Sequence, residues 1–245
     1  NLIMDKKTII LIPARMSSTR FPGKPLAPIG GVPMVVYCAR NALKTNLEVY
    51  VCTDSKEIYS VCDLYDIKSI MTPECNTGTD RLAIASKKLD ADFIINLQGD
   101  EPLIDHNSIN KLIQNIPLLH KEDDLIINGI TNISSEEAFD PNNVKCAIIQ
   151  EKEKVLYFSR KPLLNNSNQE EGQNYFKQVG LYAMSLKNLK KFASLPQSTL
   201  EKAEKVEMLR WLENGYSIKS CLLDCKNISV DTPQDLVDVI EIVQS

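Results

Sequence analysis

Histidine and glycine are both scarce in this chain of 245 residues. The only two histidines, His106 and His120, do not stand near a nucleophile or in an HExxH pattern. A Ser-His-Asp hydrolase or a histidine-rich metal site therefore has no support in the sequence. The chain contains nine glycines, and "ARMSSTR", which follows the first strand-like segment, has none. The GxGxxG fingerprint of dehydrogenases and the GxxxxGK[ST] loop of ATPases are thus both missing where they would be expected.

Long hydrophobic runs are missing as well. The apolar run near the start, "TIILIPA" (8–14), is too short to span a bilayer and lacks the cleavage pattern of a secretory signal. We therefore expect a cytoplasmic protein with no membrane insertion. The net charge of −4 argues against a nucleic-acid-binding protein. Seven scattered cysteines, an odd number, favour reduced and packed thiols over a disulfide framework.

The first half of the chain alternates short apolar runs with amphipathic segments, the pattern of βαβ units around a parallel sheet. We therefore expect an α/β protein with one domain over residues 1–245. Ligands of such sheets bind beyond the carboxyl ends of the strands, so the loops after Ala14, Thr53 and Gln98 should line one crevice. The expected strands are 8–14, 48–53, 69–72 and 93–98, and the expected helices are 33–44, 55–65 and 79–89.

The pattern changes near Asp124, where consecutive extended runs predict antiparallel pairing in a small β insertion, approximately residues 134–195. A polar stretch, "NNSNQEEGQN" (165–174), lies between the last two runs. The expected strands are 124–133, 143–150, 155–160, 176–185 and 217–224, and the expected helices are 186–195, one continuous helix over 199–215 and a last helix from Thr232.

One loop is basic although the chain is acidic overall. Between Asp5 and Glu48 there is no acidic residue, and Arg15, Arg20 and Lys24 follow the first strand within ten residues. Two guanidinium groups and an ammonium group at the carboxyl end of a strand are suited to bind phosphates. A solvated basic turn is the alternative, but the clustering favours an anion site.

Two carboxylates could complete such a site. Asp100 in "NLQGDEPL" follows a buried-type strand, and Asp231 stands in "SVDTP" before the last helix. Together they could hold Mg²⁺ on a triphosphate, because this ion takes much of its shell from water and phosphate. The alternatives are a surface turn at Asp100 and a helix cap at Asp231. Thr79 in "NTGTDRLA" likewise either contacts a ligand at a helix amino end or caps that helix.

Several of these segments together resemble one family. "IPARMSSTRFPGKPL", "TGTDRLA", "NLQGDEP", "LYFSR" and "VDTPQDL" occur in this order and are similar to motifs of the 3-deoxy-manno-octulosonate (Kdo) cytidylyltransferases. The resemblance runs over nearly the whole chain. It implies a Rossmann-like nucleotide-diphospho-sugar transferase core that works as a homodimer through the inserted subdomain at about 134–195, which would also bind the sugar. The implied reaction joins CTP to an eight-carbon sugar acid, giving the CMP-sugar and pyrophosphate for lipopolysaccharide or capsule.

The resemblance also implies roles for individual residues. Arg15, Lys24 and Asp100 would be catalytic, and Asp100 and Asp231 would bind Mg²⁺. Further residues would bind the two substrates: Arg15, Arg20, Lys24, Thr79 and Gln98 the nucleotide, and Arg160, Gln178, Tyr182 and Glu207 the sugar. Selection of cytosine rests on the resemblance alone.

Two positions depart from the family pattern. Gln178 stands where related enzymes usually carry histidine, and Met208 where they usually carry glutamine. Because both were expected near the sugar, an amino-substituted Kdo or a sialic-type acid remains an alternative to Kdo. A nucleotide-binding module without catalysis is a second alternative, but such a module has no need for both Asp100 and Asp231.

Overall fold

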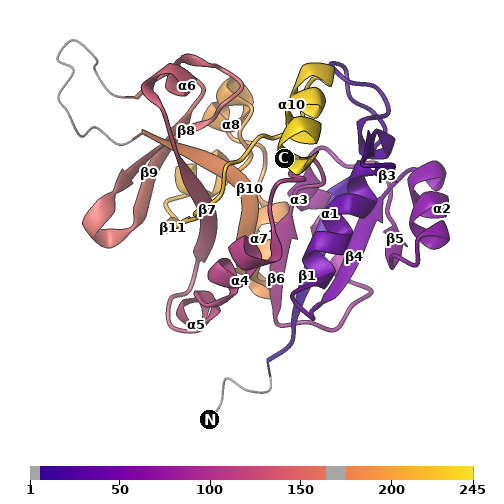
Figure 1. The fold of residues 1–245 in the computed structure, drawn as a ribbon. Coiled ribbons are helices and arrows are strands. Elements are labelled where there is room, and N and C mark those ends of the chain that lie inside the picture. The colour runs from indigo at the N-terminus through magenta and orange to yellow at the C-terminus, as the bar shows by residue number, and fades with distance from the viewer. Residues whose placement is uncertain (1–5, 164–174, 245) are drawn as a thin grey trace.

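A mixed sheet forms the centre of the protein, shown in Figure 1 as a computed structural model that describes residues 6–163 and 175–244. Its strands in chain order are β1 Thr8–Ala14, β4 Glu48–Thr53, β5 Ser69–Met71, β6 Phe93–Leu97, β7 Leu125–Ile133, β8 Lys145–Ile149, β9 Lys154–Ser159, β10 Tyr175–Ser185 and β11 Ser217–Leu222. Their order in the sheet is β5-β4-β1-β6-β10-β7-β11-β9-β8. A separate hairpin pairs β2 Pro28–Ile29 with β3 Val32–Pro33.

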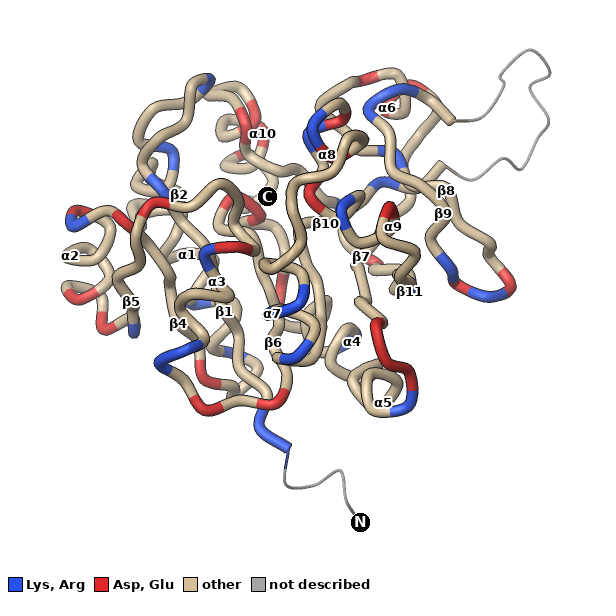
Figure 2. Tube along the Cα trace, turned by 180° about the vertical axis from the view of Figure 1, so that it is seen from behind, with Lys and Arg blue, Asp and Glu red and all other residues tan. Residues whose placement is uncertain are grey.

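Helices cover both faces of this sheet. Figure 1 shows α1 and α10 in front, and Figure 2, from behind, shows α3 and α7 over the same strands. The helices are α1 Met34–Leu43, α2 Lys56–Leu64, α3 Gly78–Ser86, α4 His106–Ile113, α5 Ile116–Leu119, α6 Ser135–Phe139, α7 Leu186–Ser194, α8 Thr199–Glu204, α9 Leu209–Glu213 and α10 Pro233–Gln244, with 3₁₀ turns η1 Lys24–Leu26 and η2 Gln150–Lys152.

The continuous apolar sequence of β1 follows from this two-sided cover. Ile10 and Ile12 join the cluster under α1 and α10, whereas Ile9 and Leu11 join the cluster that includes α3, α7 and α9. Successive side chains of a strand point to opposite faces, so a strand covered on both sides needs an apolar residue at every position. The protein thus has two cores, one on each face of the sheet.

The α/β prediction is confirmed, and the strands and helices expected before residue 98 are all present with small shifts of their ends. The second half differs in how its strands pair. β10 pairs antiparallel with β7, as expected for consecutive extended runs. It also pairs antiparallel with β6, and β11 pairs parallel with β7, so these strands extend the central sheet. β8 and β9 form an antiparallel pair at its edge. The stretch 165–174 lies outside the described residues.

The prediction of one continuous helix over 199–215 is wrong. Lys205 adopts the left-handed conformation with φ of 55° and ends α8, and a separate helix, α9, begins at Leu209. Lysine has good helix propensity, so nothing in the local pattern marks this break. Gly215 follows α9 with φ of 80°, the left-handed conformation in which a glycine commonly ends a helix.

None of the helices in the described parts of the chain combines the length and apolar character needed to cross a membrane.

A buried ion-pair network joins three helices on one face. The guanidinium of Arg210 in α9 donates two hydrogen bonds to Glu201 of α8, at 2.9 and 2.7 Å, and two to Asp80 of α3, at 2.8 and 3.5 Å. Arg210 and Glu201 are both buried. Charges removed from water are tolerated only when they are paired, so this network fixes how α3, α8 and α9 meet.

Arg210→Met should lower the free energy of unfolding by about 3–5 kcal/mol, because it leaves the Glu201 carboxylate buried without its partner. Urea unfolding followed by circular dichroism measures this change. Lys187→Met is the matched control: it removes the exposed Lys187–Asp123 pair and should cost less than about 1 kcal/mol. Equal losses in the two variants would contradict the structural role of the network.

Candidate active site

A cleft of about 1100 Å³ opens at the carboxyl edge of the parallel strands. The loop after β1 contributes Arg15, Arg20 and Lys24 to its walls, and the loop after β6 contributes Gln98 and Asp100. β1 and β6 are parallel neighbours, so their carboxyl ends lie side by side. The loop after β4, which was also expected to line the crevice, contributes none of the lining residues; its Asp54 instead binds the cleft residue Arg81 at 2.6 Å.

Lys24 connects the two aspartates predicted from the sequence. Its ammonium nitrogen lies 2.7 Å from Asp100 Oδ2 and 3.5 Å from Asp231 Oδ1, and its side chain is only 13% exposed. Arg20 binds the other oxygen of Asp231 at 3.0 Å. Burial alone would lower the pKa of Lys24, but the two carboxylates outweigh it and the pKa of this amine is raised.

The backbone around Asp231 leaves its carboxylate available to the cleft. Thr232 and Asp235 provide the capping contacts at the start of α10: Thr232 Oγ1 accepts from Asp235 N at 3.3 Å, and Asp235 Oδ2 accepts from Thr232 N at 2.7 Å. The side chain of Asp231 instead faces Lys24 and Arg20. Thr232 rather than Asp231 is therefore the residue whose side chain caps this helix.

Thr79 and Gln98 belong to one hydrogen-bonded chain. Asn96 donates to Thr79 Oγ1 at 3.1 Å, and Gln98 Nε2 donates to Asn96 Oδ1 at 2.8 Å. Gln98 lines the cleft, whereas Thr79 is fully buried behind it. Thr77, not Thr79, caps α3 by accepting from Asp80 N at 3.2 Å.

Arg160 lines the cleft from the opposite wall, after β9. Its guanidinium donates to the main-chain carbonyls of Glu204, Pro141 and Lys205 at 2.8, 3.0 and 3.4 Å. No carboxylate lies within 4 Å of this guanidinium among the described residues. Carbonyl dipoles fix the side chain without neutralising it, so its positive charge remains available to an anion.

The other residues expected to bind sugar are not among those that line this cleft. Gln178 donates to Asn128 Oδ1 at 3.0 Å, and Tyr182 is buried in the core on the α3 side. Glu207 accepts from Thr79 N at 3.3 Å. Burial raises the pKa of the Glu207 carboxyl. Burial also raises the pKa of the Tyr182 hydroxyl, and the nearby Glu207 carboxylate raises it further. Met208 is fully buried in the same core.

The sequence did not single out three residues that shape the cleft. Arg81 stands in a motif that was noted for its threonines, and it binds Asp54 and Thr72. Asn142, in a turn with no motif, accepts from Arg20 at 3.0 Å. Lys145 is buried and donates to the carbonyls of Asp140, Asn143 and Arg160, so it ties the two loops of this wall together. Burial lowers the pKa of this amine.

The donor set of the cleft fits a hard cation such as Mg²⁺. Asp100 and Asp231 approach the same point and are both partly exposed to the cleft. Within the described residues there is no group of three or more histidine, cysteine, aspartate or glutamate side chains that could hold a metal. A pair of carboxylates is still sufficient for Mg²⁺ when phosphate and water provide the remaining ligands.

An α/β sheet with basic side chains and a carboxylate pair at its carboxyl edge is typical of proteins that act on nucleotides. The cytidylyltransferase family matches residues 9–220, so the chain belongs to this family. The resemblance found in the sequence motifs is thereby confirmed.

Individual relatives match over almost their whole length. A 3-deoxy-manno-octulosonate cytidylyltransferase of Chlorobium limicola is 39% identical, with 93% of this chain and 94% of the relative covered. An 8-amino-3,8-dideoxy-manno-octulosonate cytidylyltransferase of Shewanella baltica is 40% identical at the same coverage. A solved structure of a CMP:2-keto-3-deoxy-manno-octonic acid synthetase complexed with CTP has a TM-score of 0.87 and 36% identity, covering 97% of this chain and 98% of the other.

Proposed function

We propose that this enzyme transfers the cytidylyl group of CTP to Kdo or a closely related 2-keto-3-deoxy sugar acid. The anomeric hydroxyl oxygen of the sugar bonds to the α-phosphorus, and the bond from that phosphorus to the bridging oxygen breaks. Pyrophosphate leaves, and the hydroxyl proton passes to solvent. The products are the CMP-sugar and pyrophosphate.

The observation that carries the proposal is the pairing of cations with carboxylates in one cleft. Lys24 and Arg20 both contact Asp231, and Lys24 also contacts Asp100. In-line phosphoryl transfer requires little covalent chemistry from a protein and depends on stabilising the charge of the phosphates and of the leaving group. Arg15 lines the same cleft and would bind the triphosphate with Arg20 and Lys24.

Asp100 and Asp231 would hold Mg²⁺ in this scheme. When bound, the ion would supply positive charge next to the phosphate oxygens and lower the pKa of a bound hydroxyl. Two features of the fold would position it: Asp100 lies in the loop after β6, and Val230 N donates to Asp100 O at 2.9 Å, which brings Asp231 beside it. The cations of the loop orient the triphosphate toward this point.

The sugar acid would lie against the wall formed by Arg160, whose guanidinium would bind the carboxylate of the substrate. Gln178, Tyr182 and Glu207 do not line the cleft, so they would affect sugar binding only through neighbouring residues. Thr79 would act on the nucleotide through Asn96 and Gln98, because only Gln98 reaches the cleft.

An amino-substituted Kdo is the second candidate substrate. Gln178 departs from the histidine usual in related enzymes, and one relative of 40% identity carries the name of an amino-Kdo enzyme. A glutamine side chain has no charge near neutral pH, so even from its position outside the cleft lining Gln178 would add no positive charge that repels a substrate amine.

The purified protein should release pyrophosphate from CTP only when Mg²⁺ and a suitable sugar acid are both present. A coupled pyrophosphate assay with Kdo, 8-amino-Kdo and a sialic acid identifies the acceptor, and omission of Mg²⁺ or addition of EDTA gives the blank. If the protein binds CTP but releases no pyrophosphate with any of the three acids, it is a nucleotide-binding module, and the proposed transferase activity is wrong.

Asp100→Asn should reduce turnover at least about a hundredfold, since it removes charge from the point where the phosphates react. Binding of CTP in EDTA should persist, because the cations of the basic loop remain. Steady-state kinetics and calorimetry measure the two quantities. Asp224→Asn, in an exposed pair with Lys111, serves as control and should retain full activity. Near-normal turnover of Asp100→Asn would contradict the proposal that Asp100 binds the metal.

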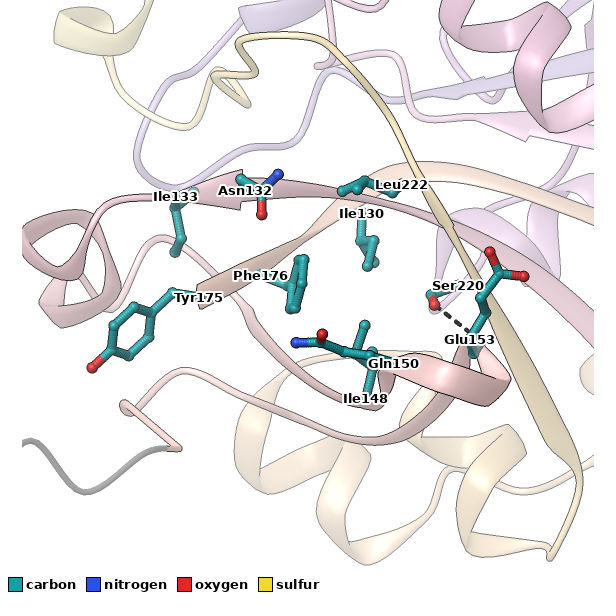
Figure 3. A pocket seen from close by; sticks show the side chains of 10 residues that line it. All are labelled: Ile130, Asn132, Ile133, Ile148, Gln150, Glu153, Tyr175, Phe176, Ser220 and Leu222. Carbon is teal, nitrogen blue, oxygen red and sulfur yellow. Dashed lines mark hydrogen bonds between the residues drawn. The ribbon is translucent and has the colours of Figure 1, made fainter. Parts of the chain in front are cut away.

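The enzyme would work in the cytoplasm as a homodimer that pairs through the face formed by β7, β8, β10 and β11. Support comes from a groove of about 360 Å³ between these strands, which has both apolar and polar lining residues and shares none of them with the active-site cleft (Figure 3). Its apolar lining includes Ile130, Ile133, Ile148, Tyr175, Phe176 and Leu222. A two-fold axis at this groove would bury the same patch on both copies.

Leu222→Glu should convert the dimer into a monomer, because a carboxylate in a desolvated interface has no partner there. Sedimentation velocity across a concentration series measures the change. Leu64→Glu provides the matched control: Leu64 is 77% exposed on α2, whereas Leu222 is 39% exposed. A wild-type monomer at all concentrations would contradict the dimer, and a dimer retained by Leu222→Glu would contradict this interface.

A further inference from the structure

Glu101 has no role in the scheme above, although it directly follows Asp100. Asp100 faces the cleft, whereas Glu101 points into the protein and is only 3% exposed. Burial raises the pKa of the Glu101 carboxyl, and the neighbouring Asp100 raises it further. A buried carboxyl group is costly unless its contacts offset the loss of water, so its hydrogen bonds are informative.

Those hydrogen bonds join three separate segments. Glu101 Oε1 accepts from Gly180 N at 2.8 Å and from Ser229 Oγ at 2.7 Å. Gly180 lies in β10 where its pairing with β7 shifts register, and Ser229 lies two residues before Asp231. One carboxyl oxygen thus holds the loop of Asp100, strand β10 and the segment that carries Asp231.

Two backbone hydrogen bonds join the same three segments. Gln98 N donates to Gly180 O at 2.8 Å, and Val230 N donates to Asp100 O at 2.9 Å. The approach of β10 is close: a Cβ atom on Gly180 would lie 2.7 Å from Glu101 Oε1 and 2.9 Å from Gln98 Cβ. Only glycine permits this contact, so the fold around Glu101 has little room for rearrangement.

From this arrangement we infer that Glu101 is a positioning residue: its carboxyl group sets the separation of Asp100 and Asp231 and thereby the affinity of the pair for a divalent cation. Partners that orient metal ligands from behind affect metal affinity strongly even though they do not touch the ion. This inference rests on the proposed function, because it concerns the proposed metal site.

The test compares Glu101→Ala with Glu101→Gln. Glutamine keeps an oxygen that can accept from Gly180 and Ser229 but has no charge, whereas alanine loses both contacts. Binding of Mn²⁺ in the presence of CTP, measured from the electron paramagnetic resonance of the free ion, is the main readout. Binding of CTP in EDTA and the melting temperature are measured in parallel.

Glu101→Ala should weaken Mn²⁺ binding by about 10-fold or more. Glu101→Gln should stay within about threefold of wild type, because the hydrogen bonds survive. Binding of CTP without metal should be unchanged in both. Ser229→Ala removes one contact from the other side and should weaken Mn²⁺ binding by about 2- to 10-fold, the value of one hydrogen bond. If Glu101→Ala does not fold, Ser229→Ala tests the inference in its place.

Equal losses in the alanine and glutamine variants would overturn the inference, since charge rather than position would then govern affinity. Unchanged Mn²⁺ binding in Ser229→Ala and Glu101→Ala, with only a lower melting temperature, would also overturn it. If wild-type protein with CTP bound binds no Mn²⁺, the proposed metal site itself is wrong. This result differs from one in which wild-type protein binds Mn²⁺ and only the expected effects of the variants are missing.

Discussion

The ion pairs of Lys24 with Asp100 and Asp231 are the contacts on which the site depends. These residues are separated by 76 and 207 positions along the chain, so no local structure could bring them together. β1 and β6 deliver Lys24 and Asp100 to one edge of the sheet because the strands are parallel neighbours. Asp231 arrives only after the chain has completed β11 and returned across the sheet. The site therefore exists only in the completed fold.

The elements before residue 98 could be predicted because each is determined by local pattern. β1 and β6 are short apolar runs buried on both faces, and the helices between them show one apolar side. The second half could be predicted less well, because its arrangement depends on long-range pairing. β11 joins β7 in parallel across 83 intervening residues, and no periodicity within β11 specifies that partner. The break at Lys205 depends on a backbone conformation that lysine does not favour.

The residues of the site, too, could be predicted from the sequence only in part. Arg15 and Lys24 lie in the loop after β1, and Asp100 lies in the loop after β6. The rule that ligands bind at the carboxyl edge was therefore sufficient to bring these three residues together. Residues that act from behind the cleft give no such signal. Lys145 and Glu101 are charged residues in ordinary positions of the sequence, and only their burial and hydrogen bonds distinguish them. Asn142 reaches Arg20 from a turn that has no motif.

Charge balance links the basic loop to the carboxylate pair in the proposed reaction. Lys24 now lies between Asp100 and Asp231, and a divalent cation bound by both would take the same space. Two neighbouring cations repel unless further negative charge accompanies them. A triphosphate would supply that charge: its oxygens would offer Lys24 and Arg20 new partners and would leave the carboxylates free to bind the metal. A carboxylate pair that already holds an ammonium group is thus better suited to a metal that arrives with the nucleotide than to the free ion.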